Sequence, residues 1–228
     1  MTPLVIAHRG ASSVALENTL AAFRAAAGVG ADAVELDVHA TIDGELVVHH
    51  DPSLLGLPIA QARAKDLAAI PLSNGEHIPT LAQALDVLGQ LKVFVEVKVL
   101  DPKWDDRLLQ TLDRGPNPSG YAVHSFAYHV VRRLKDKRQN LPTGILSEVV
   151  TKSPRQTLTD AGAQTLWQER STLDEALVKT VHDLGATIIA WTVDNPADME
   201  RLTRWGADGI CTNHPERGRR VVDAFRAA

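Results

Sequence analysis

The chain has 228 residues, of which 44% are hydrophobic and 23% charged, and this length suffices for one large hydrophobic core. The formal net charge of −4 gives no sign of the broad basic surface that nucleic-acid binding requires. We therefore expect a single domain over residues 1–228 with no nucleic-acid partner.

The cysteine content and the N-terminal residues indicate in which cellular compartment the protein is found. The single cysteine, Cys211, excludes an internal disulfide, and we expect it to be a small buried residue. Residues 1–3 lead into a short strand without the basic and apolar regions of a secretory signal. No apolar run approaches the roughly 18 residues of a membrane span. These features predict a cytoplasmic protein with no membrane span, and nothing in the sequence indicates an oligomeric state.

Short apolar segments rich in β-branched residues alternate with amphipathic segments along the chain. Eight segments are predicted strands, at residues 4–7, 33–38, 92–99, 121–126, 143–146, 164–168, 187–193 and 209–212. Six Ala/Leu-rich segments are predicted helices, at residues 19–27, 81–91, 104–112, 128–137, 173–184 and 197–205. This alternation favours a parallel sheet, and eight units in this length suit an α/β fold of the TIM (β/α)8 barrel type. An open, doubly wound sheet is the alternative.

The interval between the second and third strands is too long for a simple βα unit and predicts an insertion at about residues 45–79. Asp43-Gly44 is a turn signal, so His50 is expected to return on a strand-like segment beside the second strand. Residues 52–79 contain four prolines and little periodicity. We expect them to form a loop over the mouth of the barrel.

Charged residues recur at alternate positions in two of the predicted strands. Glu35 and Asp37 share one face of the second strand, and Glu96 and Lys98 repeat this spacing in the third. The valines and the leucine between and beside them form the opposite, apolar face. Because catalytic residues of a barrel lie at the C-terminal ends of its strands, we expect these side chains to converge on one mouth.

Three carboxylates in one cavity predict a bound metal ion. Removing each from water costs several kcal/mol unless a cation compensates the charge. A set of oxygen ligands without cysteine suits a hard divalent cation, Mg²⁺ or Ca²⁺. The alternative is an ion-pair cluster that uses Arg9 and Lys98 instead of a metal.

Two histidines near these acids are candidate acid–base groups. His8 ends the first strand and His50 follows the Asp43-Gly44 turn, and imidazole both accepts and donates protons near neutral pH. The other histidines, including His124, have no paired acid in the sequence and are expected to be structural. Cations beside the histidines indicate phosphoryl chemistry, and without a P-loop or a dinucleotide glycine motif the phosphate belongs to the substrate.

Short motifs that contain these residues follow one another along nearly the whole chain. They are Ala7-His8-Arg9-Gly10-Ala11, Glu17-Asn18-Thr19, Glu35-Leu36-Asp37-Val38, Thr41 with Asp43-Gly44, Val47-Val48-His49-His50-Asp51, Glu96-Val97-Lys98, Ser125-Phe126, Trp191-Thr192-Val193 and Ala207-Asp208-Gly209-Ile210. In this order the set resembles the glycerophosphodiester phosphodiesterase family. Each motif alone is a weak signal, but the ordered set is specific.

The resemblance implies a TIM barrel with a small insertion after the second strand. It also implies metal ligands at Glu35, Asp37 and Glu96, an acid–base pair at His8 and His50, and phosphate contacts at Arg9 and Lys98. In this family the glycerol 2-hydroxyl is thought to attack the phosphorus, and water then opens the cyclic phosphate. The substrate would be a small glycerophosphodiester, and the products sn-glycerol 3-phosphate and an alcohol.

A few positions depart from the family pattern or allow two interpretations. Leu16 replaces a usual proline and Asn213 a frequent aspartate, and we expect neither change to touch the chemistry. Trp191 and Phe126 are predicted to wall the glycerol or alcohol side of the site, with simple packing as the alternative. Glu17 either assists the site or starts the first helix.

Two other functions compete with this reading. One is a lysophospholipase-D-like activity on acylated substrates, which the short insertion and the lack of a membrane anchor disfavour. The other is a non-catalytic barrel that only binds phosphodiesters, which the presence of every expected ligand and both histidines disfavours.

Overall fold

Eight parallel strands close into a barrel in the computed structural model, which describes residues 2–227. The strands follow one another around the ring, and β1 pairs with both β11 and β2. They are β1 (Leu4–His8), β2 (Ala33–Ala40), β6 (Lys92–Val97), β7 (Tyr121–Ser125), β8 (Thr143–Ser147), β9 (Thr165–Glu169), β10 (Thr187–Trp191) and β11 (Gly209–Thr212). The predicted TIM barrel is confirmed, each predicted strand is present, and the open sheet is excluded.

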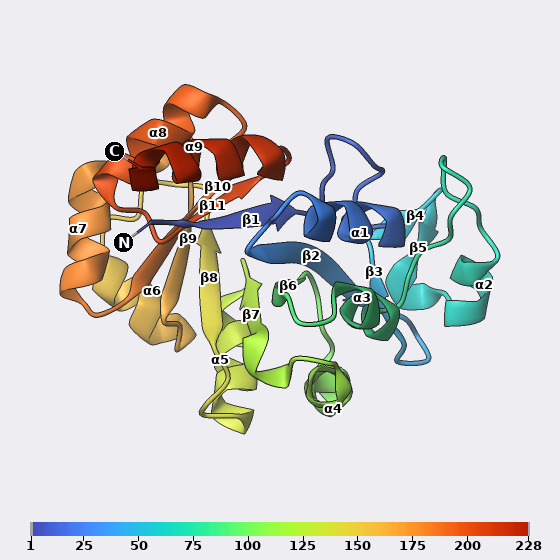
Figure 1. The fold of residues 1–228 in the computed structure, drawn as a ribbon. Helices are drawn as coiled ribbons and strands as arrows, with labels where there is room; N and C mark the ends of the chain where they lie inside the picture. Colours follow the sequence, from blue (N-terminus) through green and yellow to red (C-terminus); the bar gives the residue numbers. More distant parts are fainter. Residues whose placement is uncertain (1, 228) are drawn as a thin grey trace.

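Helices surround the barrel and connect its strands (Figure 1). They are α1 (Leu20–Gly28), α3 (Leu81–Leu88), α4 (Asp105–Arg114), α5 (Tyr128–Lys137), α6 (Pro154–Ala161), α7 (Glu175–Asp183), α8 (Pro196–Trp205) and α9 (Pro215–Ala227). Short 3₁₀ turns η2 (Pro102–Trp104), η3 (Pro118–Gly120) and η4 (Arg170–Thr172) lie between them. No helix within residues 2–227 is long and apolar enough to cross a membrane.

Two of these helices, α6 and α9, were not predicted from the sequence. Helix α6 has a polar, threonine-rich surface, and α9 contains an internal glycine and several arginines, so neither shows the Ala/Leu pattern of the others. Gly218 in α9 is required by packing, because a Cβ there would lie 2.9 Å from Val5 Cγ1 of β1.

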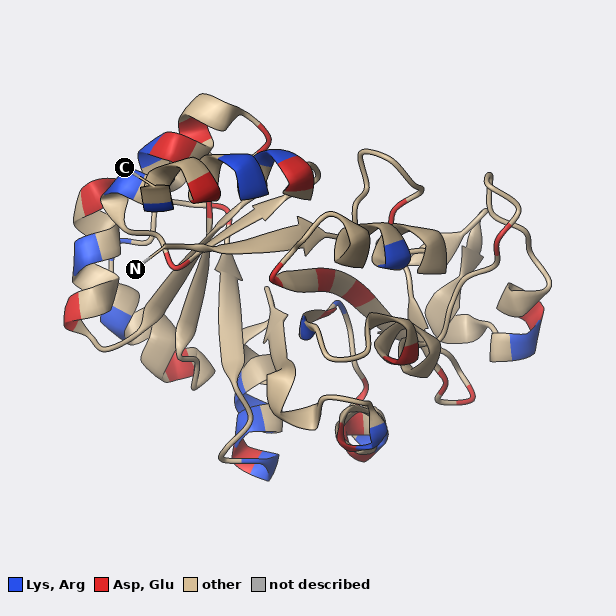
Figure 2. Cartoon of the chain, viewed as in Figure 1, with Lys and Arg blue, Asp and Glu red and all other residues tan. Residues whose placement is uncertain are grey.

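Side chains alternate between the outside and the inside of the barrel, as the strand pattern predicts. The outward valines of β2 and β6 pack with the covering helices in one core. Inside, Ile6, Trp167, Ile189 and the buried Cys211 form a separate apolar layer. Figure 2 shows acidic positions on β2 in the middle of the molecule, whereas most other charged positions lie on the surrounding helices and loops.

The insertion after β2 is a folded unit rather than a loop. It contains β3 (Leu46–Val48), which pairs antiparallel with β2, the hairpin β4 (Ser53–Leu54) with β5 (Leu57–Pro58), the turn η1 (Ile59–Gln61) and the helix α2 (Ala64–Ala68). It lies on the side toward which β1 points, opposite α7 (Figure 1). The loop prediction for residues 52–79 is therefore wrong, because strands of two residues and a five-residue helix are too short to show periodicity.

This insertion has its own small hydrophobic core. Its members are Val47, Leu54, Ile59, Ala62, Leu67 and Ile78, with Leu67 fully buried. Apolar residues of the segment that was predicted to be a loop thus pack together in a core. We conclude that the segment holds a defined shape beside the barrel.

Leu67→Ala is expected to lower the free energy of unfolding by about 2–5 kcal/mol, because it leaves a cavity in a core of six residues. Urea unfolding measured by circular dichroism would give this difference, with the exposed Lys65→Ala on the same helix as control, at about 0.5 kcal/mol or less. Equal stabilities for the two variants would show that this core does not stabilise the chain.

Candidate active site

The segment after β1 brings two polar residues, Arg9 and Asn18, to the mouth of the barrel. Arg9 and Asn18 both have φ of 56°, in the left-handed region. For a residue such as arginine this conformation costs about 1–3 kcal/mol, and such strain concentrates at functional sites. Gly10 has φ of 84°, and a Cβ there would lie 2.7 Å from the Ala22 carbonyl carbon. The turn therefore needs glycine to pack against α1.

The strand register aligns the charged residues across four neighbouring strands. His8 of β1 is level with Glu35 of β2, and Asp37 of β2 is level with Glu96 of β6. Glu96 is in turn level with His124 of β7. Because all these strands are parallel, the side chains meet at one end of the barrel, as the sequence predicted for the acids.

Asp37 is fully buried and surrounded by donors. Its Oδ2 accepts a hydrogen bond from Asn18 Nδ2 at 2.7 Å and lies 3.1 Å from Arg9 Nε, and its Oδ1 lies 2.8 Å from Lys98 Nζ. Burial alone would raise the pKa of Asp37, but Lys98 and Arg9 outweigh it and lower this pKa. The aspartate is thus held ionised. Sequence reasoning missed Asn18, although the Glu17-Asn18-Thr19 motif contained it.

The two cations each contact a second carboxylate. Lys98 Nζ lies 2.7 Å from Glu96 Oε1, and Arg9 Nη1 donates to Glu17 Oε1 at 2.8 Å. The side chain of Thr19, not that of Glu17, caps α1. These contacts favour the site role for Glu17 over the helix-start role. The ion-pair cluster that the sequence allowed is thus present in part, because Arg9 and Lys98 pair with Asp37 and Glu96.

Glu35 is the carboxylate that these pairs leave uncompensated. Its Oε1 is buried without a hydrogen-bond partner within the described chain, and its Oε2 accepts only a long bond from the Arg9 backbone N–H at 3.2 Å. Burial, followed by the charges of Asp37 and Glu96, raises the pKa of Glu35 well above its usual value. Burial and Asp37 likewise raise the pKa of Glu96 to about 7. The cluster therefore has an excess of buried negative charge.

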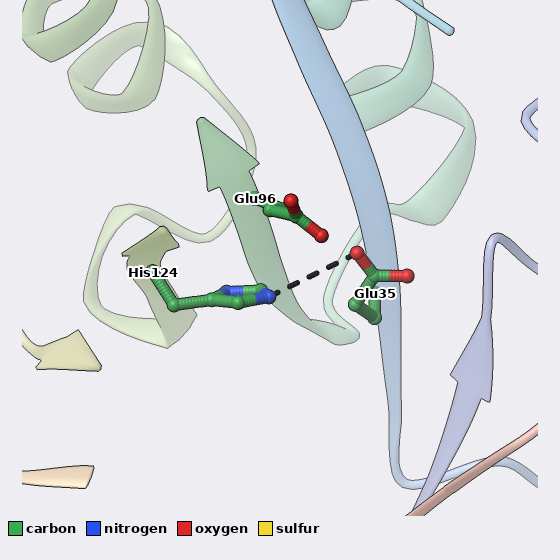
Figure 3. A group of neighbouring side chains, drawn as sticks. All are labelled: Glu35, Glu96 and His124. Atoms are coloured by element: carbon green, nitrogen blue, oxygen red, sulfur yellow. Dashed lines mark ion pairs between the residues drawn. The ribbon is translucent and has the colours of Figure 1, made fainter. Parts of the chain in front are cut away.

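His124 completes a group with these two glutamates (Figure 3). Its Nε2 lies 3.9 Å from Glu35 Oε1, and one ligand atom from each of the three residues lies within 4.8 Å of the others. Its ring stacks on Trp167 at 4.2 Å, and burial lowers its pKa to about 3, so the imidazole is neutral. His124, which has no paired acid in the sequence and was expected to be structural, thus has two acidic neighbours in the fold. The signal lay in the β6–β7 register, which single-strand patterns do not show.

These donors fit a hard divalent cation. Glu35 and Glu96 supply buried carboxylate oxygens, the ligands that Mg²⁺ and Ca²⁺ prefer, and the orphaned Glu35 Oε1 is a buried acceptor that a cation would satisfy. A cation would also offset the like-charge repulsion that raises both pKa values. Asp37, the third predicted ligand, adjoins the same cluster but is engaged by three donors.

His8 lies at the edge of this cluster. Its Nε2 is 4.0 Å from Glu35 Oε2, its side chain is 16% exposed, and burial followed by the Arg9 charge lowers its pKa. Its Nδ1 lies 2.8 Å from Asn213 Oδ1. Asn213 therefore contacts one of the candidate acid–base groups directly, although its departure from the family pattern was expected not to touch the chemistry.

His50 stands apart from the ion pairs, just after β3. Its Nδ1 lies 2.8 Å from Asp51 Oδ1, and its side chain is 39% exposed. Within residues 2–227 no side-chain hydrogen bond or ion pair joins His50 to the buried acids. The backbone holds it beside β2 instead, since His49 N–H donates to the Asp37 carbonyl at 3.0 Å and His39 Nε2 lies 3.2 Å from the His50 carbonyl.

The two predicted aromatic residues form a separate part of the mouth. Trp191 ends β10 and Phe126 follows β7, and their rings meet edge to face at 5.6 Å. Phe126 is 42% exposed, which suits a wall that a ligand can reach, whereas Trp191 is half-buried and packs partly on the interior layer. The contact with the interior layer supports the packing interpretation for Trp191, and the wall role of both aromatic residues stays a prediction.

Comparison with known proteins assigns this arrangement to a family. The model of the glycerophosphoryl diester phosphodiesterase family matches residues 8–217, and this span contains every candidate site residue described above. The chain belongs to this family. It is therefore an enzyme, a phosphodiesterase, and the non-catalytic alternative is set aside.

Relatives of this phosphodiesterase carry the same description. A glycerophosphodiester phosphodiesterase of Caldanaerobacter subterraneus subsp. tengcongensis is 32% identical over 233 residues, covering 95% of this chain and 96% of the relative. One from Bacillus subtilis is 28% identical over 258 residues, covering 97% of this chain and 87% of the relative.

Solved structures share the fold of this phosphodiesterase. A glycerophosphodiester phosphodiesterase from Parabacteroides distasonis superimposes with a TM-score of 0.90 at 29% identity, covering 100% of this chain and 99% of that one. A phosphodiesterase from Oleispira antarctica, in complex with the product sn-glycerol-3-phosphate, has a TM-score of 0.91 and covers 97% of each chain. At 24% identity this second likeness shows the fold alone.

Proposed function

We propose that this phosphodiesterase hydrolyses glycerophosphodiesters to sn-glycerol 3-phosphate and an alcohol, with a divalent metal and with His8 and His50 as the acid–base pair. The observation that carries this proposal is the buried Glu35–Glu96 pair beside His8, with two cations at the same mouth. The names of the relatives and the product bound to the Oleispira antarctica protein support the same substrate class.

Each side chain at the mouth has a distinct task in this reaction. Arg9 and Lys98 bind phosphate oxygens, because a guanidinium has five N–H donors and an ammonium three, more than their contacts with the acids use. His8 and His50 exchange protons with the attacking and the departing oxygen. Phe126 and Trp191 wall the glycerol or alcohol side.

Glu35, Asp37 and Glu96 would hold the metal, Mg²⁺ or Ca²⁺. When bound, the cation would supply positive charge to the phosphate oxygens. His124 is an alternative third ligand, since it is neutral and lies near both glutamates, whereas Asp37 would have to share its oxygens with Lys98 or Asn18. Asp37 also holds Arg9 and Lys98 in place, at 3.1 Å and 2.8 Å.

Incubation with glycerophosphocholine and Mg²⁺ or Ca²⁺ is expected to release sn-glycerol 3-phosphate, which glycerol-3-phosphate dehydrogenase detects through NADH. Glycerophosphoethanolamine and glycerophosphoglycerol, each with both metals, complete the substrate panel. Bis(4-nitrophenyl) phosphate separates general diesterase activity from activity that needs a glycerol group. The absence of release from all three glycerophosphodiesters with either metal would contradict the proposal.

A second candidate, activity on acylated substrates, is favoured by one surface feature. Val99, Phe126, Val149 and Val150 follow the C-terminal ends of β6, β7 and β8 and are between 42% and 76% exposed. Apolar side chains on the rim of a charged site suit an amphiphilic substrate. A larger kcat/KM for lysophosphatidylcholine than for glycerophosphocholine would establish this candidate, and a smaller one would reject it.

One further proposal concerns the whole chain. We propose that it forms one domain, because the insertion leaves β2 and returns to β6, its neighbour in the same barrel. The cytoplasmic location stays a prediction from the sequence.

A further inference from the structure

Asn213, directly after β11, lies at the centre of a hydrogen-bond chain behind His8. Its Oδ1 is 2.8 Å from His8 Nδ1 and 2.9 Å from Ser12 Oγ, which also lies 2.9 Å from the His8 carbonyl. On the other side, Asn213 Nδ2 donates to Asp194 Oδ2 at 2.8 Å. Asp194 Oδ1 accepts two more bonds, at 2.9 Å each, from the Asn213 backbone N–H and the Thr212 hydroxyl.

This chain determines which way the Asn213 amide faces. An ionised carboxylate only accepts hydrogen bonds, so the NH₂ group must face Asp194 and the oxygen must face His8. Burial alone would raise the pKa of Asp194, but hydrogen bonds from Asn213 and Thr212 lower it, in agreement with an ionised group. The reversed amide would place two oxygens against each other.

The orientation of the amide in turn determines the tautomer of His8. An amide oxygen cannot donate, so His8 Nδ1 must carry the hydrogen of this 2.8 Å contact. In a neutral imidazole the other nitrogen, Nε2, then has the free lone pair. This atom is the one that lies 4.0 Å from Glu35, on the side of the buried acids.

We propose that Asn213, oriented by Asp194, is a positioning residue that holds His8 in the Nδ1–H tautomer and makes Nε2 the nitrogen through which His8 exchanges protons with the substrate. The role resembles that of the groups that orient histidines in other active sites. It rests on the proposed function for its kinetic consequence, but the tautomer itself is a property of the free protein.

The decisive variant exchanges the side chains of Asp194 and Asn213. In Asp194→Asn/Asn213→Asp, a carboxylate at 213 would still accept from His8 Nδ1–H, and an amide at 194 would still donate to its other oxygen. Asn213→Asp alone places two carboxylates in contact, and Asp194→Asn alone removes the group that orients the amide. Asn213→Ala removes the acceptor of His8 altogether.

The expected results separate positioning from general stability. Asn213→Ala should lower kcat on glycerophosphocholine about 10- to 100-fold with KM changed by about twofold or less, and the exchanged pair should recover most of the loss of either single variant. Asn195→Ala, which removes the neighbouring cap of α8 without touching His8, should keep the kcat of the unaltered enzyme. If Asn213→Ala does not fold, the kcat of the exchanged pair is compared with the kcat of Asp194→Asn and of Asn213→Asp, and recovery in the pair gives the same support.

NMR of the protein with ¹⁵N-labelled histidine provides a readout independent of turnover. His8, assigned from the signal missing in His8→Gln, should show a protonated Nδ1 in the unaltered protein and in the exchanged pair, and a mixture of tautomers in Asn213→Ala. An Nε2–H tautomer in the unaltered protein, or an exchanged pair as slow as the worse single variant, would overturn the proposal. Failure of the proposed function alone would abolish turnover but leave the Nδ1–H signal.

Discussion

His8→Ala and His50→Ala are each expected to lower kcat on glycerophosphodiesters about 10²- to 10⁴-fold, the range that positioned acid–base groups contribute. Each variant removes a proton-exchanging group at the mouth, His8 beside Glu35 and His50 beside Asp51. Neither side chain belongs to a hydrophobic core, so folding should change little. Steady-state kinetics with glycerophosphocholine and thermal unfolding would measure both effects.

His129→Ala is the matched control, since His129 is an exposed histidine on α5. It should keep full activity. Histidine variants with unaltered rates and confirmed folding would refute the acid–base assignment. A loss confined to one variant would restrict the assignment to that histidine.

Glu35→Gln is expected to abolish metal binding and to reduce activity about 10²-fold or more, because its carboxylate is the one of the three predicted ligands that no Lys or Arg side chain within residues 2–227 pairs with. Calorimetric titration of the chelator-treated protein with Mg²⁺ or Ca²⁺ measures binding without turnover. At 100 times its Kd the metal should stabilise the unaltered protein by about 2.7 kcal/mol and this variant by much less.

Three further variants complete the metal experiment. Glu175→Gln, at an exposed position on the outer helix α7, is the control and should bind metal normally. His124→Ala and Asp37→Asn distinguish the candidate third ligands, because loss of the true ligand should weaken metal binding more. A Glu35→Gln protein that binds metal as tightly as the unaltered one would contradict the placement of the site.

The barrel could be predicted from the sequence because each strand carries a local signal. The alternation of apolar with other side chains in β2 and β6 shows in a window of six residues, and so do the apolar faces of most helices. The insertion could not be predicted in this way. Its strands are two or three residues long, and its core joins Val47 to Ile78 across a segment without periodicity.

The site was predictable only as far as residues share a strand or a motif. Glu35 and Asp37 are two positions apart, but His124 meets Glu35 through the register of β2, β6 and β7. Asn213 is 205 positions from His8, and only the closure of the barrel between β11 and β1 brings the two together. Such contacts depend on the whole ring of strands, which no local pattern encodes.

The two candidate acid–base histidines belong to parts of the molecule that are stabilised differently. His8 ends a strand of the barrel, whereas His50 follows β3 and precedes the hairpin of the insertion, whose core has only six fully buried or nearly buried members. Regions with few buried contacts open at lower free energy than the global transition. Opening of the insertion alone would carry His50 away while the barrel stays intact. On heating, the insertion would then open first, and the enzyme would lose activity at a lower temperature than that at which the barrel unfolds.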